Sequence, residues 1–414
     1  MTFSVAAVLQ LVLAIGIATS AVFYAVTLFG AWNFFRHARR RRRSKLESGT
    51  FRAVTILKPL NGADAELYDN LASYCQLDYP VYQLVFGVRD AEDPAVGVVR
   101  RLQGTYPRQQ IELVIDGRVY GSNYKVSNLQ NMYRAAQHDV IVIADSDVRV
   151  PPDYLRRIVC QLSDACVGVV SCLYRARNGG GMPTRCEALF VNTDFIPMVL
   201  LARVVEKPTY AFGATMALRR TTLDEIGGFL PLANLLADDY HIGQRVVALG
   251  YRSALADLVV ETVAAGATWR EVLEHQLRWA RTYRTCRPRG YFCSIVTHGT
   301  LWATLNLLYA QVSPPAIAVA ALMYALRVGI AWRIATRYLG VPLSRREALL
   351  VPFKDLLASI LWLLSYCGDT VVWSGNRFRV SRNGEMSVVT TAPRPYLAPI
   401  PYRRSRHEDR PASA

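Results

Sequence analysis

An uncharged stretch at the start of the chain constrains the fold more than any other feature. From Phe3 to Phe35 there is no Asp, Glu, Lys or Arg, and a helix needs about 20 apolar residues to cross the hydrocarbon core of a bilayer. Residues 36–45 then include seven basic side chains. A secretory signal peptide carries its charge before a shorter apolar run. We therefore predict a transmembrane helix over residues 1–35 and a basic juxtamembrane linker over 36–52.

The basic run indicates the side of the membrane on which the rest of the chain lies. Cytoplasmic flanks of transmembrane helices are enriched in Lys and Arg, so we expect the N-terminus outside and residue 36 onward in the cytoplasm. The chain carries 48 Lys and Arg against 32 Asp and Glu, a net charge of +16. A nucleic-acid patch is the alternative interpretation of the run. Beside a transmembrane helix, anionic lipid headgroups are the expected partner.

The composition is that of a folded chain with membrane segments. Apolar residues make up 52% of it and charged residues 19%, and the mean hydropathy is +0.15. These values exclude an intrinsically disordered or collagen-like chain. The eight cysteines form no Cys-x-x-Cys pair and are too sparse for a disulfide scaffold. We interpret them as buried thiols in a reducing compartment.

A second apolar zone follows later in the chain. Residues 290–326 carry no formal charge, and two prolines at 314 and 315 interrupt them. This pattern predicts a transmembrane hairpin over 290–335, with arms at 292–313 and 315–333.

The last apolar stretch, residues 356–368, has only 13 residues. Because a span needs about 20, we expect 336–389 to be a cytoplasmic, interfacial or re-entrant segment. A further full crossing is the alternative. The tail, residues 390–414, is rich in Pro and Arg and is predicted to be unordered.

Between the membrane zones, residues 53–289 alternate strand and helix patterns. Alternation of this kind indicates a mostly parallel sheet covered on both faces, and such sheets bind ligands at the carboxyl ends of their strands. The predicted strands are 53–57, 82–88, 111–115 and 140–144, and the predicted helices include 66–75, 95–102 and 127–136.

An Asp-Ser-Asp motif follows the fourth predicted strand. Asp145 and Asp147 flank a single residue there, and two carboxylates at a strand end can hold a hard divalent cation that also takes phosphate oxygens. An ordinary turn or helix cap is the alternative.

Two further motifs contain candidate functional residues. Asp238 is expected to cap a helix over 239–249, and Asp239 could act as a general base. Near residue 275 a helical pattern carries Arg278 beside Trp279. This helix could lie on lipid headgroups with its basic face, or the pair could clamp a diphosphate and stack on a sugar or base.

In combination, these motifs resemble those of the inverting GT-A glycosyltransferases. The similarity is greatest to the ceramide glucosyltransferase family, and within it to the bacterial branch of hopanoid-biosynthesis glycosyltransferases. The matching stretches are 56–60, 86–94, 125–129, 144–154, 236–240 and 277–281, with 351–357, Trp373 and 377–379 near the end of the chain, and the match to the hopanoid branch includes 294–298.

The resemblance implies an α/β GT-A fold with a UDP-sugar site in its cytoplasmic domain. By analogy, Asp90 lies at the uracil and Lys125 near the nucleotide. Asp145 and Asp147 correspond to the acids that hold Mg²⁺ or Mn²⁺ and the diphosphate.

The remaining correspondences concern the reaction itself. Asp239 corresponds to the catalytic base, and Arg278 with Trp279 corresponds to the Arg-Trp pair near the diphosphate and the acceptor. Two departures from the family pattern stand out. His275 replaces a Gln or Arg, which weakens the case for a processive polymer synthase, and Tyr124 replaces a proline before the lysine.

The implied reaction moves glucose or N-acetylglucosamine from UDP-glucose or UDP-N-acetylglucosamine to the hydroxyl of a membrane lipid. Ceramide and a hopanoid are the candidate acceptors, and a bacterial inner membrane is the expected location. A processive polysaccharide synthase of the same catalytic fold is one alternative. A basic, membrane-anchored nucleic-acid-binding or lipid-binding protein is another, although we expect no nucleic-acid partner because the basic residues concentrate beside membrane segments.

Overall fold

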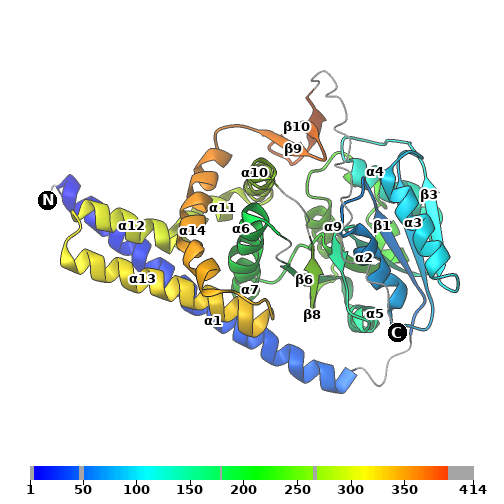
Figure 1. Cartoon of the computed structure of the whole chain (residues 1–414), viewed down its shortest axis with the longest axis horizontal. Coiled ribbons are helices and arrows are strands. Elements are labelled where there is room, and N and C mark those ends of the chain that lie inside the picture. Colours follow the sequence, from blue (N-terminus) through cyan, green and yellow to red (C-terminus); the bar gives the residue numbers. More distant parts are fainter. Residues whose placement is uncertain (1–3, 46–50, 178–179, 264–267, 390–414) are drawn as a thin grey trace, which may run out of the picture.

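The computed structural model describes residues 4–45, 51–177, 180–263 and 268–389. Figure 1 shows an α/β domain from which a bundle of long helices extends to one side. The predicted unordered tail, residues 390–414, lies outside the described residues.

An eight-stranded sheet forms the centre of the α/β domain, in the order β3-β2-β1-β4-β7-β6-β8-β5. The first four strands of this order are parallel, whereas β7 runs antiparallel to both of its neighbours. This arrangement confirms the mostly parallel sheet, and all four predicted strands are present. The strands are β1 (Val54–Pro59), β2 (Tyr82–Val88), β3 (Gln110–Ile115), β4 (Val140–Ala144), β5 (Val148–Arg149), β6 (Val167–Ala176), β7 (Thr215–Arg219) and β8 (Arg252–Thr262).

Helices cover both faces of this sheet, so its central strands are buried on both sides. In β4, Val140 and Val142 pack into one hydrophobic cluster and Ile141 and Ile143 into another, because successive side chains of a strand point to opposite faces. This explains why the strand is apolar throughout rather than alternating. The covering helices are α2 (Leu67–Ala72), α3 (Pro94–Thr105), α4 (Tyr124–Tyr133), α5 (Tyr154–Val159), α8 (Arg220–Glu225) and α9 (Asp238–Ala248).

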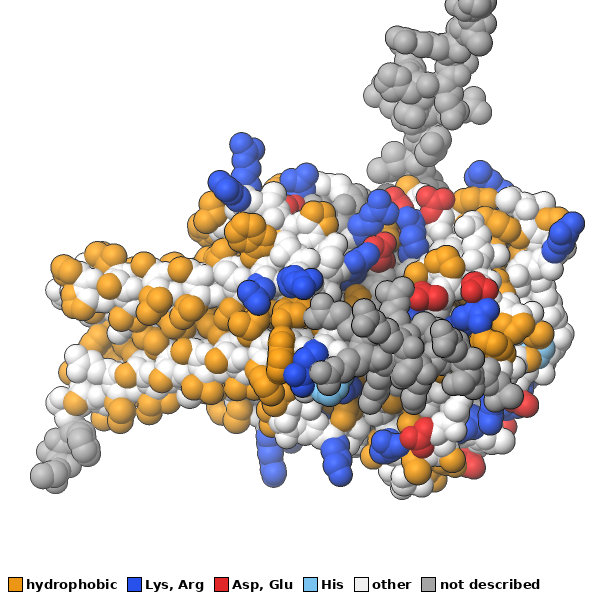
Figure 2. Space-filling view, turned by 90° about the horizontal axis from the view of Figure 1, so that it is seen from below, with side chains coloured by type: hydrophobic (Ala, Val, Ile, Leu, Met, Phe, Trp, Pro, Cys, Tyr) orange, Lys and Arg blue, Asp and Glu red, His pale blue; other side chains and the backbone are white. Residues whose placement is uncertain are grey.

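The helical bundle contains the predicted membrane segments. α1 (Val5–Lys45), α12 (Gly299–Tyr309) and α13 (Pro314–Arg333) lie side by side. Large apolar side chains are exposed on all three; for example, Leu11 and Leu322 are each 60% exposed. Figure 2 shows hydrophobic and uncharged side chains along the bundle, with Lys and Arg where it meets the α/β domain.

Within the described residues, four helical segments are long and apolar enough to cross a membrane: Val5–Ala38, Met182–Val205, Pro314–Tyr338 and Arg345–Ser365. The chain is therefore a membrane-associated protein. The second segment combines α6 (Met182–Phe190), the π-helical η3 (Val191–Phe195) and α7 (Ile196–Val205). The sequence analysis did not predict Met182–Val205 as a membrane segment. Of its most apolar stretch, 56% is buried inside the protein, against 17% for the most apolar stretch of Val5–Ala38.

The boundaries of the membrane segments differ from the predicted ones. α1 continues through the basic run to Lys45, so the expected linker is helical over much of its length. The first arm of the predicted hairpin is broken into α11 (Pro288–Cys293), a 3₁₀ turn, and α12. The second arm begins at Pro314 as expected, because proline is well suited to the first turn of a helix.

The stretch that we expected to be interfacial or re-entrant belongs to a longer helix. α14 (Arg345–Ser365) has 21 residues and begins at a capping box of Ser344 and Glu347. Its length suffices for a full crossing. The sequence suggested a shorter stretch because Lys354 and Asp355 interrupt the apolar run, but both side chains are paired inside the protein.

A small antiparallel sheet follows α14, in the order β11-β10-β9. Its strands are β9 (Thr370–Trp373), β10 (Asn376–Val380) and β11 (Met386–Val388). The sequence analysis did not predict this sheet.

The cysteines are free thiols, but they are not uniformly buried. Cys172 is buried, whereas Cys166, Cys293 and Cys367 are exposed. The prediction of buried thiols is therefore wrong for these three.

Candidate active site

A cavity of about 920 Å³ extends from the strand ends of the α/β domain to the membrane helices. Its lining includes Phe23 and Tyr24 of α1 together with Trp362 of α14. Six of the seven predicted site residues line it: Lys125, Asp145, Asp147, Asp239, Arg278 and Trp279.

Lys125 lies in the first turn of α4, where it meets two carboxylates. Its Nζ is 2.6 Å from Asp145 Oδ1 and 3.5 Å from Asp238 Oδ2. The N-cap Asn123 starts this helix, because its side chain accepts a hydrogen bond from the Val126 amide. Burial alone would lower the pKa of Lys125, but Asp145 and Asp238 hold the pKa above its usual value. The lysine is therefore charged and ties two acidic motifs together.

Lys58 is a site residue that the sequence analysis missed. It is fully buried in β1, its Nζ donates to the carbonyl oxygen of Asp145 at 2.7 Å, and Nζ lies 3.8 Å from the centre of the Tyr74 ring. Burial lowers the pKa of Lys58 to about 7, against the opposing influence of Asp147 and Asp145. A lysine at the end of an apolar strand was the available indication.

Asp147, like Asp145, is partly buried. Burial and the neighbouring Asp145 raise the pKa of Asp147 to about 7, although Lys58 opposes the shift. Two carboxylates this close repel each other, and a cation between them would relieve the repulsion. No group of three or more His, Cys, Asp or Glu that could hold a metal occurs in the described part of the chain. The pair fits a hard cation that takes its remaining ligands from substrate phosphates.

Asp238 and Asp239 form the first turn of α9, next to the positive end of its dipole. The prediction that Asp238 caps this helix is wrong: Ala237 is the N-cap, and no side chain caps it. Lys125 attracts the Asp238 carboxylate instead.

The Asp239 carboxylate is held by its own helix and faces open space. Its Oδ1 accepts a hydrogen bond from the Tyr240 amide at 2.8 Å. Burial, reinforced by Asp238, raises the pKa of Asp239 to about 6, while Lys125 opposes the shift. A Cβ at Gly213 would lie 3.1 Å from Asp239 Oδ2, so the glycine keeps room beside the carboxylate. These properties suit a general base that works near neutral pH.

Arg278 and Trp279 lie on α10 (Trp269–Cys286), which begins at a capping box of Thr268 and Glu271. Burial lowers the pKa of Arg278, and Asp145 opposes the shift. The Trp279 ring lies 5.5 Å from the ring of Phe195.

His275, one helical turn before Trp279, joins two cavity walls. Its Nδ1 is hydrogen-bonded to Glu187 of α6, and its ring meets the edge of the Trp279 ring at 5.0 Å. The family pattern has Gln or Arg at this position. This chain has a histidine instead, and its contacts orient Trp279.

Asp90 is the predicted site residue that the structure does not bring to the cavity lining. It follows β2 on an exposed turn, where its Oδ1 accepts from the Glu92 amide at 3.0 Å. Its neighbour Arg89 lines the cavity and lies over the Tyr124 ring at 4.2 Å.

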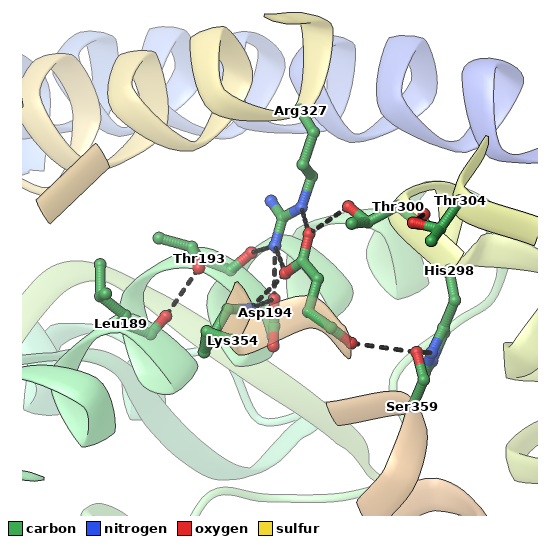
Figure 3. A network of polar contacts seen from close by, with 10 residues as sticks. Leu189, Thr193, Asp194, His298, Thr300, Thr304, Arg327, Lys354 and Ser359 are labelled. Carbon is green, nitrogen blue, oxygen red and sulfur yellow. Dashed lines mark hydrogen bonds and ion pairs between the residues drawn. The ribbon is translucent and has the colours of Figure 1, made fainter. Parts of the chain in front are cut away.

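A buried ion network borders the membrane end of the cavity (Figure 3). Arg327 of α13 pairs with Asp194 at 2.6 Å and with Asp355 at 2.7 Å. Lys354 pairs with Asp355 at 2.6 Å, and Thr300 donates to Asp355 at 2.8 Å. Two cations and two carboxylates thus connect α13, α14 and η3, and the sequence did not indicate this network.

Comparison with known proteins identifies a family. The model of glycosyl transferase family 21 matches residues 12–386. Ceramide glucosyltransferase 3 of Caenorhabditis elegans is 26% identical over 236 residues, which are 57% of this chain and 51% of that protein. Ceramide glucosyltransferase 1 of the same organism is 23% identical over 351 residues, or 81% of this chain and 73% of that protein.

A solved structure is also similar to this chain. A mannosyltransferase from Pyrobaculum calidifontis, in complex with GDP-Man and Mn²⁺, is 21% identical, with a TM-score of 0.48 over 85% of this chain and 98% of that one. The family match extends from the first membrane helix to the small C-terminal sheet and so includes every element around the cavity. The chain belongs to glycosyl transferase family 21.

Proposed function

We propose that this chain transfers glucose or N-acetylglucosamine from a UDP-sugar to the hydroxyl of a membrane lipid, forming a β-glycolipid. The observation that carries the proposal is the continuous cavity, which has paired acids, Lys125 and Arg278 at one end and membrane helices at the other. Such a cavity suits a reaction between a water-soluble donor and a lipid. The catalytic domain is proposed to face the cytoplasm at a bacterial inner membrane, as the basic run at the end of α1 favours.

The proposed donor site lies at the strand ends. Lys125 and Arg278 would bind the diphosphate directly, and Asp145 would bind it through the divalent cation. Asp90 would contact the uracil, a role supported by the adjacent Arg89, which lines the cavity. Asp145 and Asp147 would hold Mg²⁺ or Mn²⁺, which when bound supplies positive charge to the leaving diphosphate.

The proposed chemistry is a single in-line displacement. Asp239 accepts the proton of the lipid hydroxyl as its oxygen attacks the anomeric carbon, and UDP leaves from the opposite face of the sugar. Arg278 stabilises the charge that develops on UDP. Displacement at an α-linked donor inverts the anomeric centre, so the product is a β-glycoside.

For the acceptor, we propose a ceramide or a hopanoid. Ceramide is supported by the names of the relatives. The hopanoid is supported by the resemblance of residues 294–298 to the hopanoid branch, because Ser294, Thr297 and His298 line the cavity.

Replacement of the base tests the proposal directly. Asp239→Asn keeps the shape of the side chain and should retain UDP binding, but it should reduce transfer by a factor of about 10²–10⁴. Transfer and UDP affinity are measured on detergent-solubilised protein. Asp69→Asn, at a residue whose side chain is 68% exposed, serves as the control and should change neither. Normal turnover by Asp239→Asn would show that Asp239 is not the catalytic base.

A competition assay tests the substrates. UDP-glucose and UDP-N-acetylglucosamine are offered with ceramide and bacteriohopanetetrol in the presence of Mg²⁺ or Mn²⁺, and the lipids are read by mass spectrometry. We expect one glycosylated lipid that carries a single sugar. A long polymer would contradict the proposal and favour a polysaccharide synthase.

A further inference from the structure

The C-terminal sheet, β9 to β11, is attached to the loop that precedes Asp238 and Asp239 of α9. The amide of Leu236 donates to the carbonyl of Gly384 at 3.0 Å, and the amide of Met386 donates to the carbonyl of Asn234 at 2.7 Å. Asp238 and Asp239 follow within a few residues of these bonds. A segment from the far end of the chain is thus fixed beside the proposed base.

The same sheet also packs against the helix that carries Lys125. Phe378 of β10 is 1% exposed, and its ring lies 6.1 Å from that of Tyr124 in an edge-to-face arrangement. A third attachment connects the sheet to α10, because Arg281 donates to the carbonyl of Thr370. The sheet therefore touches the helices that supply Lys125 and Arg278 and the loop that leads into Asp239, and Figure 1 shows β9 beside α10.

Trp373 is the side chain through which this sheet reaches Arg278. The Arg278 guanidinium carbon lies 5.5 Å from the centre of the Trp373 ring, within the range of a cation–π interaction. Trp373, Ser374 and Asn376 line the cavity. Among the described residues, the salt bridges of Asp145 and Asp238 are made with Lys125 and not with Arg278.

A tight hairpin turn fixes the position of this ring. Trp373 pairs with Asn376 across the turn, and the two residues between them, Ser374 and Gly375, have positive φ angles of 47° and 76°. Two central residues of positive φ are typical of the two-residue turns whose twist matches that of the flanking strands. The turn therefore presents Trp373 at the end of β9.

We infer that Trp373 is a positioning residue that holds Arg278 in place for the diphosphate of the donor, and that the C-terminal sheet serves to set this tryptophan. The inference rests on the proposed function, because it requires a nucleoside diphosphate at Arg278. Its physical basis is that a long, flexible arginine side chain is ordered by the face of the aromatic ring before the ligand arrives.

The test measures the affinity of full-length, detergent-solubilised protein for UDP and UMP, since UMP lacks the second phosphate of the diphosphate that Arg278 is proposed to bind. Trp373→Leu removes the aromatic face, and Trp373→Phe retains part of it. We expect Trp373→Leu to weaken UDP binding by about 3-fold to about 30-fold and to leave UMP binding unchanged. The loss of UDP affinity in Trp373→Phe should be intermediate. Trp269→Leu, at an exposed tryptophan at the start of α10, is the matched control and should bind both nucleotides normally.

A double-mutant cycle separates positioning from mere structural support. If Trp373 acts through Arg278, then Trp373→Leu should have almost no further effect on UDP affinity in an Arg278→Gln protein. The same loss in both backgrounds, an equal loss for UMP, or no loss at all would each overturn the inference.

Two other results are distinguishable from these. If Trp373→Leu lowers the yield of folded protein, the same cycle is run with Trp373→Phe, and additive losses there would overturn the inference. Failure of the unmodified protein to bind either nucleotide would instead reject the UDP-sugar donor of the proposed function.

Discussion

Burial sets the chemistry of individual residues around the cavity. The pKa of Lys58 is lowered to about 7 and that of Asp147 is raised to about 7, each mainly by burial. Ordinary values would leave every such group fully charged at neutral pH. At this scale, the residue type is read from the sequence, but its protonation state depends on the surrounding protein.

The raised pKa of Asp239 predicts the pH dependence of the reaction. A base must be ionised, so kcat/KM for the lipid acceptor should be constant well above the pKa of about 6 and should fall about tenfold per pH unit below it. Acceptor kinetics from pH 5 to 8 at saturating UDP-sugar provide the measurement. An acid limb near the ordinary carboxyl value of about 4 would contradict the burial of this group.

At the scale of elements, paired charges rather than apolar contacts alone join the membrane helices to the cavity wall. Arg327 is 8% exposed on its side chain and Lys354 is 1% exposed. Buried charges of this kind are stable only when they are paired. The network therefore fixes α13 and α14 against η3.

Removal of one member of the network should destabilise the protein. Arg327→Leu leaves Asp194 and Asp355 with a single cation, Lys354, and breaking a buried pair in this way costs about 3–5 kcal/mol in the free energy of unfolding. Thermal unfolding in detergent should show a lower midpoint. Arg333→Leu, on the exposed end of the same helix, should leave the midpoint unchanged. Equal midpoints for Arg327→Leu and the unmodified protein would mean that the network contributes little to stability.

At the scale of the whole molecule, the helical bundle and the α/β domain meet around one cavity. The bundle exposes apolar side chains, and Lys and Arg mark its junction with the domain (Figure 2). The candidate site residues of the domain thus lie in the same cavity as residues of the membrane helices.

Thiol labelling tests the orientation of the domain. Cys166 is exposed on the α/β domain, so in a protein with Cys293→Ser and Cys367→Ser it is the target for a membrane-impermeant maleimide. With the domain in the cytoplasm, intact bacterial cells should leave Cys166 unlabelled, and permeabilised cells should label it. Labelling of intact cells would place the domain outside.

Much of the fold was predictable because it depends on local patterns. The bounds of the four strands from β1 to β4 were predicted to within a few residues. Short β-branched runs indicate strands that are buried on both faces of a sheet. α1 was predicted from a single uncharged stretch. Asp145, Asp147 and Asp239, which were predicted as site residues and line the cavity, each lie in a short motif at the end or start of an element.

The sequence alone therefore determined the class of fold, the membrane attachment and the acidic motifs, because each is encoded in neighbouring residues. Only the tertiary structure decided that α14 is long and that Trp373 reaches Arg278. Lys354 and Asp194 are 160 positions apart in the chain, yet the Lys354 side chain donates a hydrogen bond to the Asp194 carboxylate. Contacts of this kind depend on distance in space. A local sequence pattern does not predict which distant residue pairs with a charge in an apolar stretch.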